Sequence, residues 1–164
     1  MVGPLSPSAQ KIQNLLNDLG HPIHVVEFSA STRTSAEAAS AIGCEVAQIA
    51  KSIMFRTRDT GRPVLVVTSG SNRVNEASVT RLLAAQLGTE RLAKADADFV
   101  RQKSGYAIGG VPPIGHNVPP LTIFDRDLLG FTTVWAAAGT PNTVFPIAPE
   151  LLAKLAGGVV GDVT

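Results

Sequence analysis

The chain has 164 residues, of which 45% are hydrophobic and 16% charged, and its net charge at pH 7 is +1. This composition indicates a globular protein with a sizeable core and excludes a disordered chain. The near-neutral charge argues against a protein that wraps nucleic acid duplexes, because such proteins are strongly basic. The single cysteine, Cys44, excludes an internal disulfide and a cysteine-rich zinc site.

The N-terminal segment and the hydropathy pattern bear on where the protein works. Residues 1–10 have neither the basic n-region nor the apolar h-region of a signal peptide. No apolar run approaches the length of a membrane span. Together with a thiol that is reduced by default, these features predict a cytoplasmic protein.

The first 50 residues predict helices around one strand. Ser6 caps an amphipathic helix that ends at Gly20. A strand is expected over 24–28, and an alanine-rich helix over 35–42. Residues 46–50 predict one or two further helical turns.

The middle of the chain predicts a hairpin followed by alternating elements. β-like runs at 52–56 and 63–68 flank a polar turn, which is a hairpin signature. Asn75 is placed to cap a helix that runs to Leu87. A strand over 92–95 and a helix that Asp96 caps and that ends near Gly105 come next.

The last third of the chain predicts three strands, over 121–124, 132–136 and 144–147, and a helix over 149–155. Because the chain lacks a regular β-α-β rhythm, we expect an α/β (α+β) fold with a mixed, partly barrel-like sheet and helices outside it. The sequence contains no repeat and no internal linker, so residues 1–164 are expected to form one domain.

Residues 109–116, Gly-Gly-Val-Pro-Pro-Ile-Gly-His, form the most distinctive segment. Three glycines and two prolines exclude a helix interior or a central strand. The glycines permit close approach of another molecule, and the prolines stiffen the loop. The segment therefore predicts a rigid loop whose amides could cradle a carbonyl or a phosphate, with His116 at its end.

Lys51 is the second residue that points to chemistry, because it stands in the apolar run Ile-Ala-Lys-Ser-Ile-Met-Phe. A lysine there can hold a carbonyl, a phosphate or a ribose hydroxyl by charge-assisted hydrogen bonds. The spacing alone favours the simpler alternative, a lysine that extends its ammonium group into solvent.

The other polar residues have ordinary interpretations. His21 and His24 flank Pro22, and no further ligands cluster near any histidine, so no metal site and no cofactor are predicted. Asp125 and Asp127 follow a strand, where they bind a polar ligand or, more commonly, cap the next turn. Cys44 lacks a partner histidine nearby in sequence, so it is interpreted as a neutral thiol. Residues 138–142 predict a turn that could line a pocket, and residues 70–73 match no phosphate-binding loop.

The order of these features resembles the YbaK/ProX (YbaK/EbsC) family of aminoacyl-tRNA editing domains. The resemblance is carried by Gln-Ile-Ala-Lys-Ser-Ile-Met-Phe at 48–55, Gly-x-x-x-Pro-x-Gly at 109–115, Thr-Ile-Phe-Asp at 122–125 and Ala-Gly at 138–139. It covers the chain from about the second helix to the last. It implies a mixed sheet or barrel surrounded by helices.

The resemblance also implies a function and a site. Family members hydrolyse the ester of mischarged aminoacyl-tRNAs, often those made by prolyl-tRNA synthetase. The implied partners are thus the tRNA acceptor end and prolyl-tRNA synthetase. The implied catalytic groups are Lys51, Gly109 and Gly110, and the implied substrate-binding residues are Pro113, Gly115, His116, Asp125 and Gly139.

Three positions bear on the subgroup to which the chain is similar. Thr140 stands where members that act on cysteinyl-tRNA have a lysine, and His116 and Ser52 occupy positions at which the subgroups differ. These positions leave the amino acid open. An aminoacyl ester is already activated, so amides at Gly109 and Gly110 could stabilise the oxyanion without a dedicated nucleophile.

Two other functions remain as alternatives at the level of sequence. The first is a non-catalytic module that binds a nucleotide, an aminoacyl-tRNA or a synthetase. The second, sequence-specific DNA binding, is not expected, because the chain has no recognition-helix signature and no basic stripe.

Overall fold

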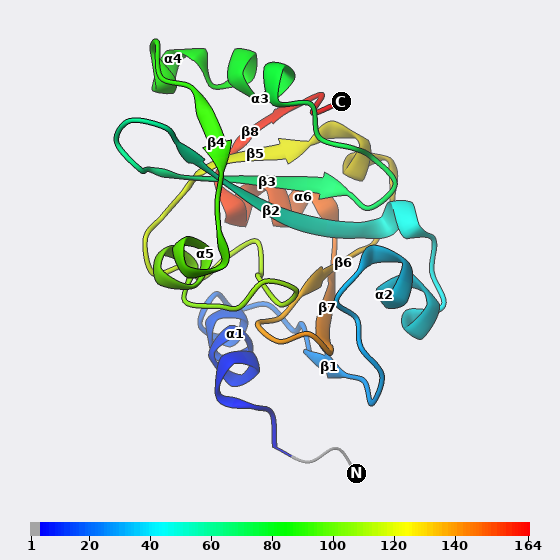
Figure 1. The fold of residues 1–164 in the computed structure, drawn as a ribbon. Helices are drawn as coiled ribbons and strands as arrows, with labels where there is room; N and C mark the ends of the chain where they lie inside the picture. The colour runs from blue at the N-terminus through cyan, green and yellow to red at the C-terminus, as the bar shows by residue number, and fades with distance from the viewer. Residues whose placement is uncertain (1–3) are drawn as a thin grey trace.

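The computed structural model describes residues 4–164; residues 1–3 of the predicted domain lie outside the described part. Figure 1 shows strands β2, β3, β5 and β8 in one half of the molecule and β6, β7 and β1 in the other. The strands are β1 (Val26–Glu27), β2 (Ile49–Thr57), β3 (Pro63–Ser69), β4 (Leu92–Lys94), β5 (Leu121–Asp125), β6 (Val134–Ala137), β7 (Thr143–Ile147) and β8 (Val159–Gly161). The helices are α1 (Pro7–Asp18), α2 (Ser35–Ile42), α3 (Glu76–Leu82), α4 (Ala84–Leu87), α5 (Ala97–Ser104) and α6 (Pro149–Ala156), with 3-10 turns η1 (Val46–Gln48) and η2 (Arg126–Gly130).

All eight strands belong to one mixed sheet, in the order β1-β7-β6-β2-β3-β5-β8, and β4 pairs with β2 off this path. The pairs β2–β6, β3–β5 and β5–β8 are parallel, whereas the others are antiparallel. The mixed sheet with helices outside it confirms the predicted fold class.

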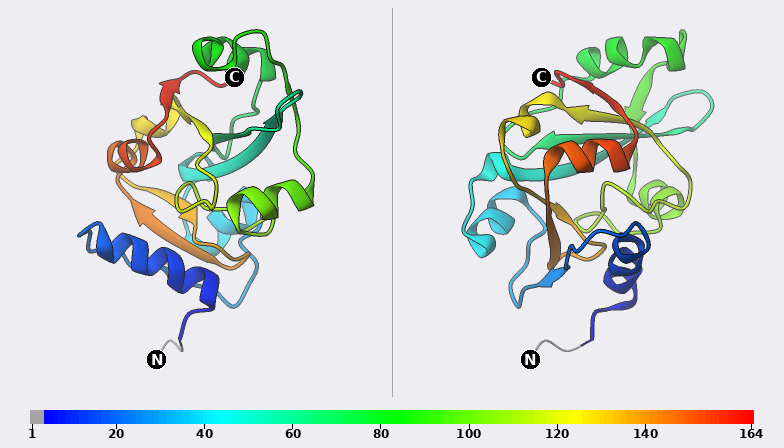
Figure 2. Two further views of the ribbon diagram at one scale, coloured as in Figure 1. Left: turned by 90° about the vertical axis from the view of Figure 1, so that its left-hand side faces the viewer. Right: turned by 180° about the vertical axis from the view of Figure 1, so that it is seen from behind.

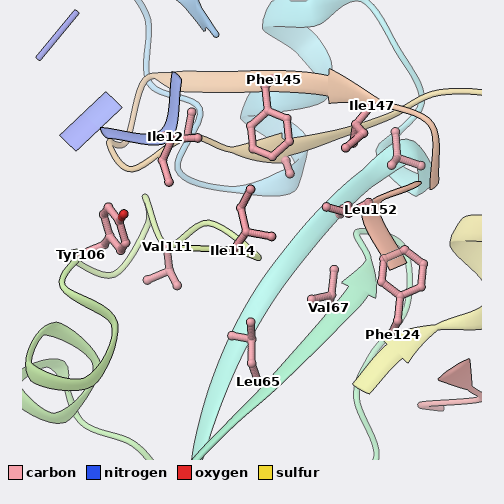
Figure 3. Close-up of a cluster of buried hydrophobic side chains, with 14 of the residues drawn as sticks. Ile12, Leu65, Val67, Tyr106, Val111, Ile114, Phe124, Phe145, Ile147 and Leu152 are labelled. Atoms are coloured by element: carbon pink, nitrogen blue, oxygen red, sulfur yellow. The ribbon is translucent and has the colours of Figure 1, made fainter. Parts of the chain in front are cut away.

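The main core lies between the two halves of the sheet. Figure 3 shows Phe145 from β7 on one side and Leu65 and Phe124 from the other half on the opposite side. Val111 and Ile114 of the glycine-proline loop lie between them and are buried. The loop therefore contributes apolar side chains to the core, and close packing there restrains its conformation.

A second core lies on the opposite face of the β2–β3–β5 half. There α3 and α4 cover the sheet, as the two views of Figure 2 also show. Val79, Leu83 and Leu87 pack on Val64 and Val66. The 3.6-residue spacing of the helical residues and the two-residue spacing of the strand residues bring these apolar faces together.

Local capping fixes most helix ends as the sequence predicts. Ser6, Asn75 and Asp96 each accept a hydrogen bond from a backbone N–H of the first helical turn. Gly43 and Gly105 end α2 and α5 with φ angles of +85° and +91°. Helix α2 (Ser35–Ile42) has the predicted bounds, and Thr34 supplies its cap.

Three predicted elements differ from the structure, and one strand was missed. Residues 24–28 give only the two-residue strand β1, which pairs with β7 alone. Residues 46–50 turn only once, and β2 already begins at Ile49. The helix expected over 75–87 is interrupted at Leu83. Strand β8 was not predicted. No helix among residues 4–164 has both the length and the apolar character needed to cross a membrane.

Candidate active site

A gap along one edge of β2 creates the site. On this edge, β6 pairs with Ile49 and Ala50, and β4 pairs with residues 55–57. Residues 51–54 lie between these two partners, and among residues 4–164 they pair only with β3 on the other edge. A cavity of about 380 Å³ opens at this gap.

The register determines which backbone groups face the gap. Gly70 N–H donates to the Ile49 carbonyl, and Thr57 N–H donates to the Arg62 carbonyl, so the odd-numbered residues of β2 bond to β3. In an antiparallel ladder, alternate residues direct both N–H and C=O to the same neighbour. The amides and carbonyls of Ser52 and Met54 therefore face the open edge, where no partner for them is found in the described part of the chain.

The walls of the cavity are largely apolar, and its charges have one sign. Among the described residues that line it, only Arg33 and Lys51 carry a charge, and both are cations. Its apolar lining includes Ala50, Met54, Val100, Val111, Ala136 and Val144. Such a site favours an apolar group attached to an anionic or carbonyl-bearing one.

Lys51 and Gly109, predicted from separate segments, line the same cavity. Gly109 has a φ of +95°, and a Cβ there would lie 2.7 Å from Cγ of Arg33. A glycine at this position thus lets the Arg33 side chain pack on the loop beside the cavity. No partner for Gly109 N–H is found among residues 4–164, so this amide is available to a ligand.

Gly110 and Gly139 hold the loop rather than line the cavity. Gly110 N–H donates to the Ala107 carbonyl at 3.1 Å, and Gly139 N–H donates to the Gly110 carbonyl at 3.0 Å. A Cβ on Gly110 would lie 2.7 Å from the Thr140 backbone. The Gly110 amide, one of the two expected to stabilise an oxyanion, is thus engaged within the loop in this conformation.

Pro113, Gly115 and His116 lie outside the cavity lining, toward α1. Nε2 of His116 lies 2.6 Å from the Pro112 carbonyl oxygen, and its Nδ1 is buried without a partner among the described residues. Burial lowers the pKa of His116, and the hydrogen bond to Pro112 opposes this only in part. These three residues therefore do not share the cavity that Lys51 and Gly109 line.

Asp125 is fully buried and also lies outside the cavity lining. Its Oδ2 accepts hydrogen bonds from Thr68 Oγ1, Ser69 N–H and Asn72 Nδ2, at 2.8 to 3.1 Å. Its Oδ1 accepts from Asp127 N–H. This carboxylate ties the end of β5 to the end of β3, so its direct effect is on the position of these segments.

Sequence reasoning gave no site role to several polar residues of the lining, among them Arg33, Ser35 and Ser52. Arg33 belongs to a short polar segment without periodicity, which gives no signal. Ser35 and Ser52 both line the cavity, and their hydroxyl oxygens are buried without a partner among the described residues. Cys44 lies outside the lining, and burial raises the pKa of its thiol. Residues 4–164 contain no group of three or more metal-ligating side chains.

Comparison with known proteins gives the family. The family model described as "Aminoacyl-tRNA editing domain" matches residues 29–155. The chain belongs to this family. The match includes both Lys51 and the glycine-proline loop, and it confirms the resemblance drawn from the sequence.

Individual relatives of this editing domain agree with the assignment. A solved structure named "Crystal structure of a putative trans-editing enzyme for prolyl tRNA synthetase" is 44% identical, with a TM-score of 0.88 over 98% of this chain and 99% of that one. The uncharacterized protein YwhH of Bacillus subtilis (strain 168) is 30% identical over 79% of each chain. "Putative Cys-tRNA(Pro)/Cys-tRNA(Cys) deacylase EbsC" of Enterococcus faecalis (strain ATCC 700802 / V583) is 26% identical over 87% of this chain and 85% of that one.

Proposed function

We propose that this editing domain is a trans-acting deacylase that hydrolyses the ester of mischarged aminoacyl-tRNA of the tRNA-Pro type. Its partners are the tRNA acceptor end and prolyl-tRNA synthetase, and it works in the cytoplasm. The family gives the class of reaction, and the name of the 44% identical structure supports the link to prolyl-tRNA synthetase.

The observation that carries the proposal is the meeting of Lys51 and Gly109 at one cavity. The cationic Lys51 attracts the electron-rich end of the substrate, either the ester carbonyl or the terminal ribose and phosphate. The free amide of Gly109 can donate to the oxygen that becomes negative when the carbonyl is attacked. The apolar wall formed by residues such as Val100, Val111 and Val144 receives the acyl side chain.

The reaction requires no nucleophilic side chain. Water adds to the ester carbonyl, the bond to the ribose oxygen breaks, and the products are a free amino acid and a tRNA with a restored hydroxyl. Because the ester is activated, positioning and oxyanion stabilisation supply the catalysis. The open-edge amides and carbonyls of Ser52 and Met54 add hydrogen-bonding groups that can orient the aminoacyl moiety.

The test is a panel of mischarged tRNAs incubated with the wild-type protein and with Lys51→Ala. We expect one or a few aminoacyl-tRNAs to be hydrolysed faster than in buffer. Lys51→Ala should lower kcat/KM by roughly 10- to 150-fold, the equivalent of one lost hydrogen bond to a charged group. Lys154→Ala is the matched control, because Lys154 is exposed on α6 and lies outside the cavity lining.

Two results would reject the proposal. One is that no member of the panel is hydrolysed above the rate in buffer, and the other is full activity of Lys51→Ala. Saturable binding of an uncleavable aminoacyl-adenosine mimic without any deacylation would instead identify a non-catalytic binding module.

A further inference from the structure

On the face of β2 that lines the cavity, the side chains of Ser52 and Met54 are followed by that of the cationic Arg56. Side chains alternate between the faces of a strand, so Arg56 shares a face of β2 with Ser52 and Met54, which line the cavity. Two strand residues span about 7 Å, so Arg56 stands about that distance beyond Met54.

Phe99 of α5 lies next to Arg56, and a second cationic side chain, Lys103, lies near the same ring. The guanidinium carbon of Arg56 lies 5.8 Å from the centre of the Phe99 ring, and Nζ of Lys103 lies at the same distance. Phe99 and Lys103 are one helical turn apart, which brings them together on α5. Two cations at one aromatic ring repel each other unless an anion lies near them.

The Arg56 guanidinium retains hydrogen-bonding capacity. Its Nη2 donates to the Arg58 carbonyl at a long 3.5 Å. Its Nε is buried and has no partner among residues 4–164. A buried guanidinium nitrogen without a partner costs free energy, and an anionic oxygen would satisfy it.

Two exposed arginines extend this cluster. Arg58 N–H donates to the Arg91 carbonyl, so the two residues are neighbours across the β2–β4 ladder. Of the nearby carboxylates, Glu90 accepts hydrogen bonds from the turn at Thr60 and Asp96 caps α5, whereas Asp59 and Asp98 are exposed. We call Arg56, Arg58, Arg91, Phe99 and Lys103 the Phe99 ridge.

The Phe99 ridge is continuous with the cavity. Val100, the residue after Phe99, lines the cavity, as does Ala95 between β4 and α5. Figure 1 shows β4 crossing the hairpin near the β2–β3 turn, and the chain then running down to α5 on that side of the molecule. A polymeric ligand whose end lies in the cavity and which extends in this direction reaches the Phe99 ridge next.

We propose that the Phe99 ridge binds the phosphates of the RNA strand whose 3′ end occupies the cavity. This inference rests on the proposed function and adds the surface that guides the RNA. Spaced cations beside an accessible aromatic ring are the usual platform for single-stranded nucleic acid. Phe99 is half-buried, so the ridge binds chiefly through its cations, which pair with phosphates. The near-neutral net charge of the chain agrees with contact to only a few phosphates.

The test measures the binding of a fluorescent RNA minihelix that carries no amino acid and has a single-stranded CCA end. The KCl concentration is varied between 50 and 200 mM. Arg56→Gln/Lys103→Gln should reduce the slope of log K against log salt by about 1.4, since each lost phosphate contact contributes about 0.7 for a single strand. Arg126→Gln/Lys154→Gln removes the same charge from exposed positions on η2 and α6 and should leave the slope unchanged.

Different results would refute the proposal about the Phe99 ridge and the proposed function. If the ridge variant hydrolyses a short aminoacyl-adenosine ester like the wild type but has a higher KM for aminoacyl-tRNA, both proposals are supported. An unchanged slope, or an equal loss in the control variant, overturns the ridge whatever the deacylation result. Tighter ridge-dependent binding of phosphatidylglycerol vesicles than of RNA also overturns it. If Arg56→Gln destabilises the fold, Arg58→Gln/Arg91→Gln, at two exposed positions, gives the same readout.

Discussion

Gly109 illustrates how one residue couples backbone geometry to the site. Its φ of +95° is unfavourable for any residue with a Cβ, and that Cβ would contact Arg33. Gly109→Ala should lower the free energy of unfolding by about 1–2 kcal/mol, the usual cost of a left-handed conformation. It should also slow deacylation, because the amide and Arg33 both move. Gly130→Ala is the control, since no atom lies within 4 Å of a Cβ there. Urea unfolding and kcat/KM check both effects, and equal behaviour of the two variants would contradict the assigned role of Gly109.

His116 gives the molecule a pH dependence at the residue scale. Burial lowers its pKa in the folded state, so the unfolded chain takes up a proton at a higher pH than the folded one. The free energy of unfolding should therefore decrease as the pH falls below about 6.5, the ordinary histidine value, and through the folded pKa. His116→Gln should remove part of this decrease, whereas His24→Gln, at an exposed position, should keep it. Urea unfolding curves between pH 5 and 8 measure the difference, and identical pH profiles for the wild type and His116→Gln would rule it out.

At the scale of the elements, Asp125 links two parallel neighbours, β3 and β5, at their ends. Asp125→Asn replaces an acceptor oxygen by an NH₂ group among four donors, so at least one buried hydrogen bond becomes a clash of donors. We expect a loss of about 2–3 kcal/mol in the free energy of unfolding, since hydrogen bonds to a charged group are involved. Asp127→Asn, at an exposed position, should cost less than 1 kcal/mol. Thermal or urea unfolding compares the two, and a similar loss in both would refute the linking role of Asp125.

The elements that the sequence predicts well are those whose signals are local. Ser6, Asn75 and Asp96 cap their helices because a short polar side chain next to free N–H groups acts within three residues. Strand β8 has no such signal, because Val159–Gly161 becomes a strand only by pairing with β5, far away in sequence. Strand order within a mixed sheet likewise depends on long-range pairing, which periodicity does not encode.

At the scale of the whole molecule, some features of the candidate site have local sequence signals, whereas others depend on long-range strand pairing. Lys51 and Gly109 were predictable as separate features, because a lysine in an apolar strand and a glycine-rich loop are unusual. Their common cavity arises because β6 leaves β2 after Ala50 and β4 joins it only at Phe55, and no local pattern gives these pairings. Arg33 lines the cavity and packs beside Gly109, a long-range proximity that its local sequence does not encode. His116 and Asp125, which the resemblance placed in the site, form hydrogen bonds within the loop and at the strand ends, outside the cavity lining.

The cavity between the two halves of the sheet should also set which acyl groups the protein accepts. Ala136 of β6 is buried and lines the cavity, so Ala136→Val narrows it without adding charge. The larger acyl groups of the aminoacyl-tRNA panel should then be hydrolysed about 10- to 200-fold more slowly relative to the smallest, since a methylene in an apolar pocket changes selectivity by that order. Ala85→Val, at an exposed position of α4, should leave the ratio unchanged. The measurement is kcat/KM for each aminoacyl-tRNA, with thermal unfolding to verify the fold. If Ala136→Val slows all acyl groups equally while remaining folded, size selection lies elsewhere than in this wall.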